Sequence, residues 1–367
     1  MYSLRILRAQ PLRLALTVGG VGLCIILMLF LWAVYCGVAD GSVEYIRKNP
    51  ADLWVLQRNA TNILRGSSIL STLHGQTIEN IPGVESVSPV LLLLSAAKKN
   101  GDSGATLFLA GYDVERGLGG PPQIVRGRTV RNGDEIVIDR SFAAKFHYRI
   151  GDSVQIQDDT LQIVGISTGT NALVVQYAFV TIQRAQSLIG YPGIATCYMV
   201  TVDDPARVSE IAARIKEKLP GVEAYDRKTF LQNNIREMET GFLPLLFTVA
   251  ALGAVVLTAV LSLLLSISIL ERRKDFAVMK MLGSPRRFLP RLIIEQSLLI
   301  TAFSSIVALV AFFPMVVLIE KMTPEISAKL SLGQVAAVIL VAGGISLLSS
   351  LIANQRLRRI YPLEAFS

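Results

Sequence analysis

Four long apolar runs mark the chain, one near its beginning and three in its last third. They cover about residues 14–35, 242–270, 297–319 and 332–353, and none has an Asp, Glu, Lys or Arg in its interior. The hydrocarbon core of a bilayer is crossed by about 20 apolar residues of helix, so each run is long enough to span a membrane. Roughly 200 mostly polar residues separate the first run from the second, which is the size of one or two domains. The pattern therefore predicts a membrane α-helical protein with four transmembrane helices in a 1+3 arrangement and a large inserted domain.

One local pattern occurs twice within the polar stretch. An apolar spacing typical of an amphipathic helix is followed by Pro-Gly-Val-Glu, at residues 82–85 and again at 220–223, and then by a strand-like run. Pro cannot continue a helix, and Gly accepts the left-handed conformation that ends one. The repeat predicts paired α+β halves within one subdomain, with chance repetition of a common helix ending as the alternative. The apolar residues 90–94 after the first turn are expected to form a buried strand or a lipid-facing patch.

Short β-branched runs lie between the two repeats. They fall at 125–130, 135–139, 153–157 and 161–166 and are separated by Gly and Asp turns. Several short strands at this spacing predict a small barrel-like β subdomain, within about residues 112–195. We thus expect an interfacial segment and first transmembrane helix, an extracytoplasmic α+β domain with this β-rich insert, and transmembrane helices 2–4 with a cytoplasmic loop. The corresponding ranges are 1–40, 41–240 and 241–367, with the loop at 271–291.

The positive charges suggest an orientation for the chain. The net charge is +8, and the Lys and Arg residues cluster before the first run, between the second and third, and after the fourth. Because Lys and Arg near membrane helices collect on the cytoplasmic side, both termini are predicted to be cytoplasmic and the large domain to lie outside. This placement accounts for the basic excess without nucleic acid. The first run is longer than the apolar part of a signal peptide and lacks a clear cleavage site, so we expect it to be retained.

The sequence offers no recognisable catalytic or metal site. It has no G-x-x-x-x-G-K-[ST] phosphate loop, no G-x-S-x-G nucleophile turn and no H-E-x-x-H zinc motif. Its three cysteines and two histidines do not have the spacing of a zinc site. His74 could bind a metal or haem, but a solvated histidine is the simpler interpretation, since no second ligand lies at regular spacing. We therefore predict that the chain is not an enzyme and binds no metal or cofactor directly.

The loop between the second and third apolar runs has the most distinctive sequence. Phe276, Met279 and Leu282 are three residues apart, which places them on one side of a short helix with charges on the other. Gly283 is suited to stop this helix, and Ser284 and Pro285 to begin another. A positively charged loop with an interfacial helix in membrane lipid would explain the arginines. It explains less well the tight turn and the acidic Glu271 and Asp275, so we favour a helix–turn–helix that docks another protein.

This loop resembles the signature of the FtsX/MacB-type ABC transporter permeases. The segment ERRKDFAVMKMLGSPRRFLPRLIIEQSLL is similar to the family pattern E-R-[RK]-x-[ED]-[IF]-[AG], then L-[RK]-A-[LM]-G-A, a basic pair and a helix with an acidic residue. Met281 and Ser284 depart from the commoner alanines. The ends of the chain, at residues 10–17 and 358–366, resemble the family's weaker terminal motifs, and the 1+3 span order also matches, as in its MacB/DevC-like members.

The resemblance implies a subunit of an ATP-driven transporter. Two permease chains, expected to be identical, would pair, and two copies of a separate ABC ATPase carrying ATP and Mg would dock on the cytoplasmic face of the bacterial inner membrane. The residues implied in ATPase coupling are Glu271, Arg272, Lys274, Asp275, Phe276, Met279, Lys280, Met281, Leu282, Gly283, Arg286, Arg287 and Phe288. Among them the basic residues would make docking contacts, Met279, Met281, Leu282 and Phe288 would be apolar anchors, and Gly283 would form the turn.

Two functions follow from the resemblance. In the first, ATP-driven motion passes through the helices into the outer domain without a channel for substrate, a mechanism called mechanotransmission. This motion would export a hydrophobic or amphipathic substrate such as a lipid, glycolipid, haem, macrolide, peptide or lipoprotein. A periplasmic membrane-fusion adaptor and an outer-membrane channel would assist. In the second, the chain is an FtsX-like signalling subunit that controls a cell-wall hydrolase and transports nothing. The size of the predicted outer domain favours export.

Overall fold

The computed structural model describes residues 11–63, 68–98, 105–172, 175–271, 288–322 and 330–358, together with Lys274, Val278, Met279, Leu282 and Pro285. The chain forms two compact units. The membrane unit takes the described residues up to Cys36, those from Pro244 to Ile319 and those of the last helix. The outer unit takes those within Gly37–Leu243 and Glu320–Ser327.

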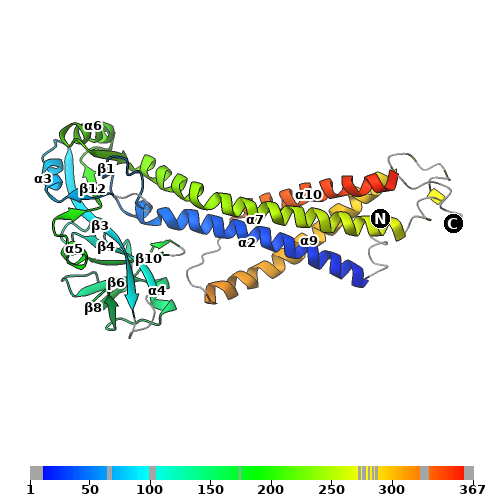
Figure 1. Cartoon of the computed structure of the whole chain (residues 1–367), viewed down its shortest axis with the longest axis horizontal. Coiled ribbons are helices and arrows are strands. Elements are labelled where there is room, and N and C mark those ends of the chain that lie inside the picture. The colour runs from blue at the N-terminus through cyan, green and yellow to red at the C-terminus, as the bar shows by residue number, and fades with distance from the viewer. Residues whose placement is uncertain are drawn as a thin grey trace. The chain divides into compact units, whose positions relative to one another are not determined.

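Long helices supply the membrane unit (Figure 1). They are α2 (Pro11–Lys48), α7 (Arg227–Glu271), α9 (Phe288–Met322) and α10 (Leu332–Arg358). Each contains a stretch apolar and long enough to cross a membrane: Leu14–Gly41, Leu243–Glu271, Pro290–Ile319 and Leu332–Gln355. The predicted 1+3 arrangement of four candidate transmembrane helices is confirmed.

Both helices that join the two units are longer than their apolar runs. Helix α2 continues to Lys48, and helix α7 already begins at Arg227. These extensions mix polar residues with buried apolar ones such as Tyr45 and Phe230. In α2 an ion pair supports the extension: Lys48 Nζ lies 3.0 Å from Glu44 Oε1, one turn away. Hydropathy alone did not predict the extensions, because it marks only the apolar part of a helix.

The membrane unit packs through a mixture of aliphatic and small hydroxyl side chains. Val21, Ile25 and Leu29 of α2 are fully buried and share one cluster with Leu257 and Leu261 of α7. Helices α9 and α10 meet at buried serines, where Ser297 Oγ donates to the Ser346 carbonyl at 2.9 Å. Small residues allow such close approach between helices in a bilayer, and hydroxyl hydrogen bonds add to it.

One part of the outer unit is a four-stranded antiparallel layer. Its strands stand in the order β13 (Val222–Asp226), β1 (Leu53–Gln57), β12 (Cys197–Val202) and β3 (Val84–Lys98). Helix α3 (Leu73–Glu79) connects β1 with β3, and helix α6 (Val208–Lys218) connects β12 with β13. Ile78, Ile211 and Ile215 of these helices join one apolar cluster with the strands. This arrangement is a split β-α-β pair, which we call the β-α-β layer.

Each half of the layer contains one of the two predicted helix–turn–strand repeats. Gly83 and Gly221 have φ of +99° and +105°, and each lies in the turn between a helix and the strand after it. These are left-handed values that glycine adopts most easily. The two repeats therefore correspond to equivalent halves of one layer, which favours paired α+β halves over chance repetition.

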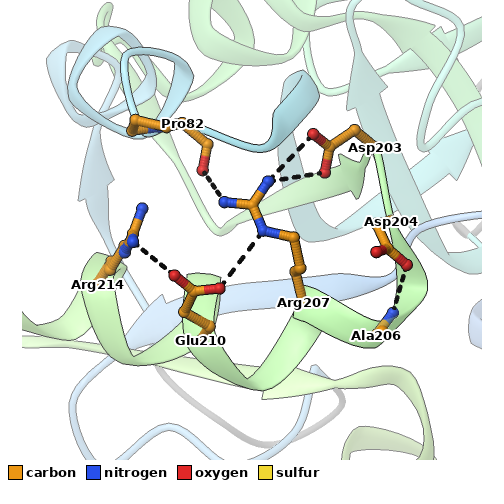
Figure 2. A network of polar contacts seen from close by, with 7 residues as sticks. All are labelled: Pro82, Asp203, Asp204, Ala206, Arg207, Glu210 and Arg214. Atoms are coloured by element: carbon orange, nitrogen blue, oxygen red, sulfur yellow. Dashed lines mark hydrogen bonds and ion pairs between the residues drawn. The ribbon is translucent and has the colours of Figure 1, made fainter.

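Arg207 connects these two halves, as Figure 2 shows. It ends the short 3-10 helix η1 (Pro205–Arg207) and donates through Nη2 to the Pro82 carbonyl at 3.4 Å. Its guanidinium also pairs with Asp203 at 3.2 Å and with Glu210 at 3.4 Å. The start of α6 is thereby tied to the turn before β3. Exposed ion pairs contribute little stability singly, so this network serves chiefly to orient the two segments.

Six strand segments close into a barrel in the second part of the outer unit. The ring of pairs runs β3–β4–β10–β6–β8–β7 and back to β3, where Ala97 is opposite Ile156. The strands added to β3 are β4 (Ala105–Tyr112), β6 (Glu135–Asp139), β7 (Ser153–Ile156), β8 (Asp159–Thr168) and β10 (Val175–Thr181). Leu109, Ile138, Val154, Ile163 and Val180 are buried in the associated cluster. The expected barrel-like β subdomain is confirmed.

Smaller elements complete the outer unit. Strand β5 (Gln123–Gly127) pairs with β8, and β9 (Asn171–Ala172) pairs with β10. Strand β2 (Leu70–Ser71) pairs with β11 (Ile194–Ala195) as a separate two-stranded sheet. Helices α4 (Arg140–Lys145) and α5 (Ile182–Ile189) pack against the barrel cluster.

The barrel uses strands that precede the predicted insert. Strands β3 and β4 supply two of its sides, although both lie before residue 113. Residues 90–94 are part of β3: Val90 and Leu91 are buried, whereas Leu94 is 60% exposed. The apolar run therefore forms a strand in which the neighbours Val90 and Leu91 are buried in two different clusters, as side chains on opposite faces of the pleat would be, while Leu94 lies at the surface.

Candidate functional site

The predicted docking loop connects α7 with α9. Of the residues predicted to couple to an ATPase, the structure describes Glu271, Lys274, Met279, Leu282 and Phe288. The remaining ones lie outside the described residues; they are Arg272, Asp275, Phe276, Lys280, Met281, Gly283, Arg286 and Arg287. Glu271 ends helix α7, and both Glu271 and Lys274 are exposed.

Apolar side chains in this loop are exposed on one side of a helical turn. The Leu282 N–H donates to the Val278 carbonyl at 2.9 Å, the spacing of one α-helical turn. Residues four apart lie on the same face of a helix. Leu282 is 83% exposed and Val278 is 44% exposed. Phe288, at the start of α9, is 45% exposed. These three apolar side chains are therefore exposed in the folded chain.

Met279 has a different environment from Leu282. It is partly buried against a cluster made by Leu265 and Ile269 of α7, Ile293 of α9 and Ala353 of α10. The sequence pattern placed Met279 and Leu282 on one face, and the structure separates them. The reason is that the ends of three helices supply an apolar surface for Met279. Met279 thus fixes the loop to its own chain.

A second set of residues joins α2 and α7 to the core of the outer unit. Near the end of α2, Tyr45 is fully buried and packs edge to face on Trp54 of β1, with ring centroids 6.2 Å apart. At the start of α7, Phe230 stacks on the same Trp54 at 4.8 Å. Aromatic pairs at these separations add to the stability that burial alone provides. Trp54 therefore contacts both helices.

Buried asparagines reinforce the attachment. Asn49, which directly follows α2, accepts a hydrogen bond from the Gly119 N–H at 3.1 Å. Asn234 of α7 accepts one from the Ile63 N–H at 3.2 Å. A buried amide that lost such a partner would be costly, so these contacts specify where each helix is held. Sequence analysis did not identify these residues, because an isolated Asn or Tyr in a polar segment has no pattern of its own.

The titratable groups buried in the outer unit have structural explanations. Burial raises the pKa of Asp139, whose carboxylate caps helix α4 by accepting from the Ser141 N–H at 2.7 Å. Burial also raises the pKa of the Cys197 thiol to about 12, which leaves it protonated and unreactive. His74 lies on α3, and among the described residues no three His, Cys, Asp or Glu side chains are grouped as metal ligands. We find no catalytic constellation in the described part of the chain.

Comparison with known families matches most of the sequence. A family model for the MacB-like periplasmic core domain matches residues 14–218, more than half of the chain. A model for the FtsX-like permease C-terminal region matches residues 247–362. The second match includes the predicted docking loop.

Full-length relatives occur among curated proteins. The chain is 25% identical over 372 residues to the uncharacterized ABC transporter permease Rv2563 of Mycobacterium tuberculosis (strain ATCC 25618 / H37Rv), covering 99% of this chain and 98% of the relative. It is 25% identical over 373 residues to the uncharacterized ABC transporter permease Rv0072 of the same strain, with the same coverage. The alignment with these relatives thus covers 99% of the chain.

Two solved structures of outer domains are similar to part of the chain. The periplasmic region of MacB from Actinobacillus actinomycetemcomitans has a TM-score of 0.41 and 13% identity, covering 51% of this chain and 94% of that one. The extracellular domain of the noncanonic ABC-type transporter YknZ from Gram-positive bacteria has a TM-score of 0.38 and 11% identity, covering 48% and 99%. Both similarities concern about half of the present chain.

Proposed function

This chain belongs to the family of FtsX/MacB-type ABC transporter permeases, and from that premise we propose that it couples ATP hydrolysis by a separate ATPase to motion of its outer domain, driving export of a hydrophobic or amphipathic substrate. As a permease it is the membrane subunit and not the catalytic one, and its family implies an ATPase partner in a transporter complex. The resemblance drawn from the loop motif is confirmed.

The observation that carries the proposal is the continuity of two helices. Helix α2 and helix α7 each contain a candidate membrane span and each extend into the outer unit, where Tyr45 and Phe230 are buried beside Trp54. We propose that an axial displacement of either helix acts on the core of the outer unit, because each helix contains both a candidate membrane span and residues of that core. A continuous helix from a membrane span into the outer unit is one physical route for mechanotransmission.

The exposed apolar residues of the loop support docking of an ATPase. Val278 and Leu282 share one exposed face, and the surrounding sequence is rich in Arg and Lys. Apolar anchors surrounded by charge are typical of protein interfaces, whereas an isolated exposed leucine is common on any surface. We propose Leu282 and Phe288 as the anchors and Arg286 and Arg287 as basic contacts, with the loop and both termini in the cytoplasm.

Export of an amphipathic substrate fits the composition of the membrane unit. Its buried polar side chains, among the described residues of the spans, are hydroxyl groups such as those of Ser297, Thr301 and Ser346. A path for a hydrophilic solute usually contains ionisable residues, which the span interiors lack. We propose two copies of the permease with two ATPase subunits, and an adaptor with an outer-membrane channel as further partners.

The docking proposal is tested with Leu282→Asp. The permease is purified with its ATPase from membranes, and the amount of ATPase recovered is measured with the ATP hydrolysis rate of the complex. Leu332→Asp is the matched control, because Leu332 is also exposed, at 91%, but begins helix α10 far from the loop in sequence. We expect loss of most of the ATPase with Leu282→Asp alone. Equal recovery from both variants would contradict docking through this loop.

Export is tested in cells that produce the complex. They are loaded with a fluorescent phospholipid, haem or a macrolide, and release of each compound is followed. We expect at least one to leave faster with the wild-type permease than with Leu282→Asp. If none does while the ATPase still docks and drives motion of the outer domain, the signalling function would replace export.

A further inference from the structure

We infer that Tyr45 and Asn49 are positioning residues that connect α2 to the barrel, whereas Phe230 and Asn234 connect α7 to the β-α-β layer, so that displacement of one helix relative to the other turns the barrel against the layer. The inference rests on the proposed function, because it assumes that the helices move. It assigns each helix a different part of the outer unit.

Two hydrogen bonds hold the loop between β4 and β5 to the end of α2. The Tyr45 hydroxyl donates to the Gly119 carbonyl at 2.7 Å, and the Gly119 N–H donates to Asn49 Oδ1 at 3.1 Å. Asn49 is itself oriented by its side-chain N–H, which donates to the Tyr45 carbonyl at 2.9 Å. The backbone carbonyl and N–H of Gly119 are therefore both bound, the first by Tyr45 of α2 and the second by Asn49, which follows α2. We call residues 113–122 the Gly119 loop.

The ring of Tyr45 contacts both parts of the outer unit. It stacks on Tyr177 of β10 in the barrel at 4.9 Å and lies 6.3 Å from Phe179 of the same strand. Its other neighbour is Trp54 of β1 in the layer. Burial raises the pKa of the Tyr45 hydroxyl well above its ordinary value, so it stays protonated as a donor. Tyr45 is thus the point where α2 meets the barrel.

The Gly119 loop lies against Val90, the residue that the β-α-β layer and the barrel share. Val90 of β3 pairs with Cys197 of β12 on one side and with Tyr112 of β4 on the other. Before Val90 the strand belongs to the layer, and after it to the barrel. A Cβ atom at Gly119 would lie 2.3 Å from Val90 Cγ2, so the loop backbone is in close contact with this junction. A shift of the loop would therefore act where the strand passes from one part to the other.

Helix α7 also contacts Trp54, and its Arg227 donates through Nη2 to the Arg47 carbonyl of α2. Phe230 stacks on Trp54 of β1 and lies 6.1 Å from Tyr225 of β13, both strands of the layer. Asn234 binds the Ile63 N–H, in the segment that follows β1. The contacts of Phe230 and Asn234 lie in the layer, whereas Tyr45 contacts both the layer and the barrel and Asn49 binds the Gly119 loop. Since β3 is continuous through both parts, the expected motion is a twist about β3 and not a separation.

The experiment measures the distance between barrel and layer in the assembled transporter. Spin labels are placed at Asp158→Cys, in the exposed turn between β7 and β8, and at Glu217→Cys, on the exposed side of α6. Cys24 and Cys36 are replaced by Ala, and Cys197 is fully buried and remains. Distances are compared without nucleotide and with ATP bound to an ATPase variant that cannot hydrolyse it.

Tyr45→Phe removes one hydrogen bond and keeps the ring, and Asn49→Ala removes the other. Tyr112→Phe is the matched control, because the Tyr112 hydroxyl is buried in the same cluster and has no hydrogen-bond partner among the described residues. We expect each of the first two variants to lose most of the ATP-dependent change in distance while ATP hydrolysis and the melting temperature stay near those of Tyr112→Phe. Running both variants keeps the test decisive if one of them does not fold.

The outcomes separate this inference from the proposed function. The inference is overturned if ATP changes the distance between the labels in both variants as much as in the otherwise wild-type permease. It is also overturned if ATP does not change this distance in the otherwise wild-type permease while the complex still exports a substrate. A wild type that neither moves nor exports overturns both. Parallel loss of motion and of melting temperature in every variant, Tyr112→Phe included, would reduce Tyr45 and Asn49 to core residues without a positioning role.

Discussion

Arg128 and Glu135 form a two-point ion pair on the barrel. Arg128 Nη1 lies 2.6 Å from Glu135 Oε2, and Arg128 Nη2 lies 2.7 Å from Oε1. The Arg131 N–H also donates to Oε2, at 2.9 Å. Glu135 is 7% exposed, so its carboxylate depends on these partners for compensation. The pair joins the segment after β5 to the first residue of β6.

This pair makes the stability of the outer unit depend on pH. The hydrogen bonds from Arg128 lower the pKa of Glu135 below its ordinary value of 4.5 in the folded chain. A group with a lowered pKa contributes its full stability above the ordinary value and loses it as the pH falls through the lowered one. We expect the melting temperature of the purified protein to fall below pH 4.5, and Glu135→Gln to be less stable at pH 7 with a smaller acid dependence. Asp158→Asn, at an exposed carboxylate, should behave like the wild type.

The two turns of the β-α-β layer respond differently to the same change. Alanine at Gly83 or Gly221 meets an unfavourable positive φ, which costs about 1–3 kcal/mol. At Gly83 the new Cβ would also lie 2.8 Å from Arg207 Nη1 and 3.0 Å from Ile211 Cδ1, whereas at Gly221 the space is open. Gly83→Ala should therefore be the more destabilising of the two in denaturant unfolding of the full chain. An equal effect would mean that Arg207 moves aside without cost.

The serine contact between α9 and α10 is expected to contribute modestly. Ser297→Ala removes a hydrogen bond to Ser346 inside the membrane unit, and such bonds average about 0.6 kcal/mol. Ser297→Leu adds volume to a fully buried site and should cost about 1–3 kcal/mol more, because the helices cannot approach as closely. Unfolding in detergent micelles measures both variants. A leucine variant as stable as the alanine variant would show that this contact between α9 and α10 can separate freely.

The charges of the docking loop offer a test of the sequence prediction. Reversing Arg286 and Arg287 together to Glu should weaken recovery of the ATPase, since an acidic surface on the partner would then be repelled. Raising the salt concentration should weaken the wild-type complex in the same direction. Membrane insertion, measured by the amount of permease in the membrane fraction, is the control. Recovery that is unaffected by both changes would contradict a role for these arginines.

The sequence predicted the elements whose signal is local. Four spans follow from apolar length alone, and the turns at Gly83 and Gly221 from a Pro-Gly pair after an amphipathic helix. A barrel-like subdomain was predicted, but not the strands that close it, because closure depends on pairing between Ala97 and Ile156, which are far apart in the sequence. The use of β3 in both parts of the outer unit was missed for the same reason.

The sequence predicted where the docking loop lies in the chain, but not which contacts its residues make. The loop was recognised from its motif, but the separation of Met279 from Leu282 depends on the apolar surface that α7, α9 and α10 form together. The roles of Tyr45 and Asn49 depend on the position of Gly119, more than 60 residues away along the chain. Tertiary contacts of this kind leave no periodic pattern.

Strand β3 limits how this outer domain can be exchanged with that of a relative. Its first half is an edge strand of the β-α-β layer, and its second half is one strand of the closed barrel. Val90 pairs with strands of both parts. A chimera joined near residue 112 would keep the donor's β6, β7, β8 and β10 but close them with foreign β3 and β4. Recombinant hybrids should therefore fold best when residues 84–202 are inherited as one block, and selection among natural homologues is expected to favour the same crossover points.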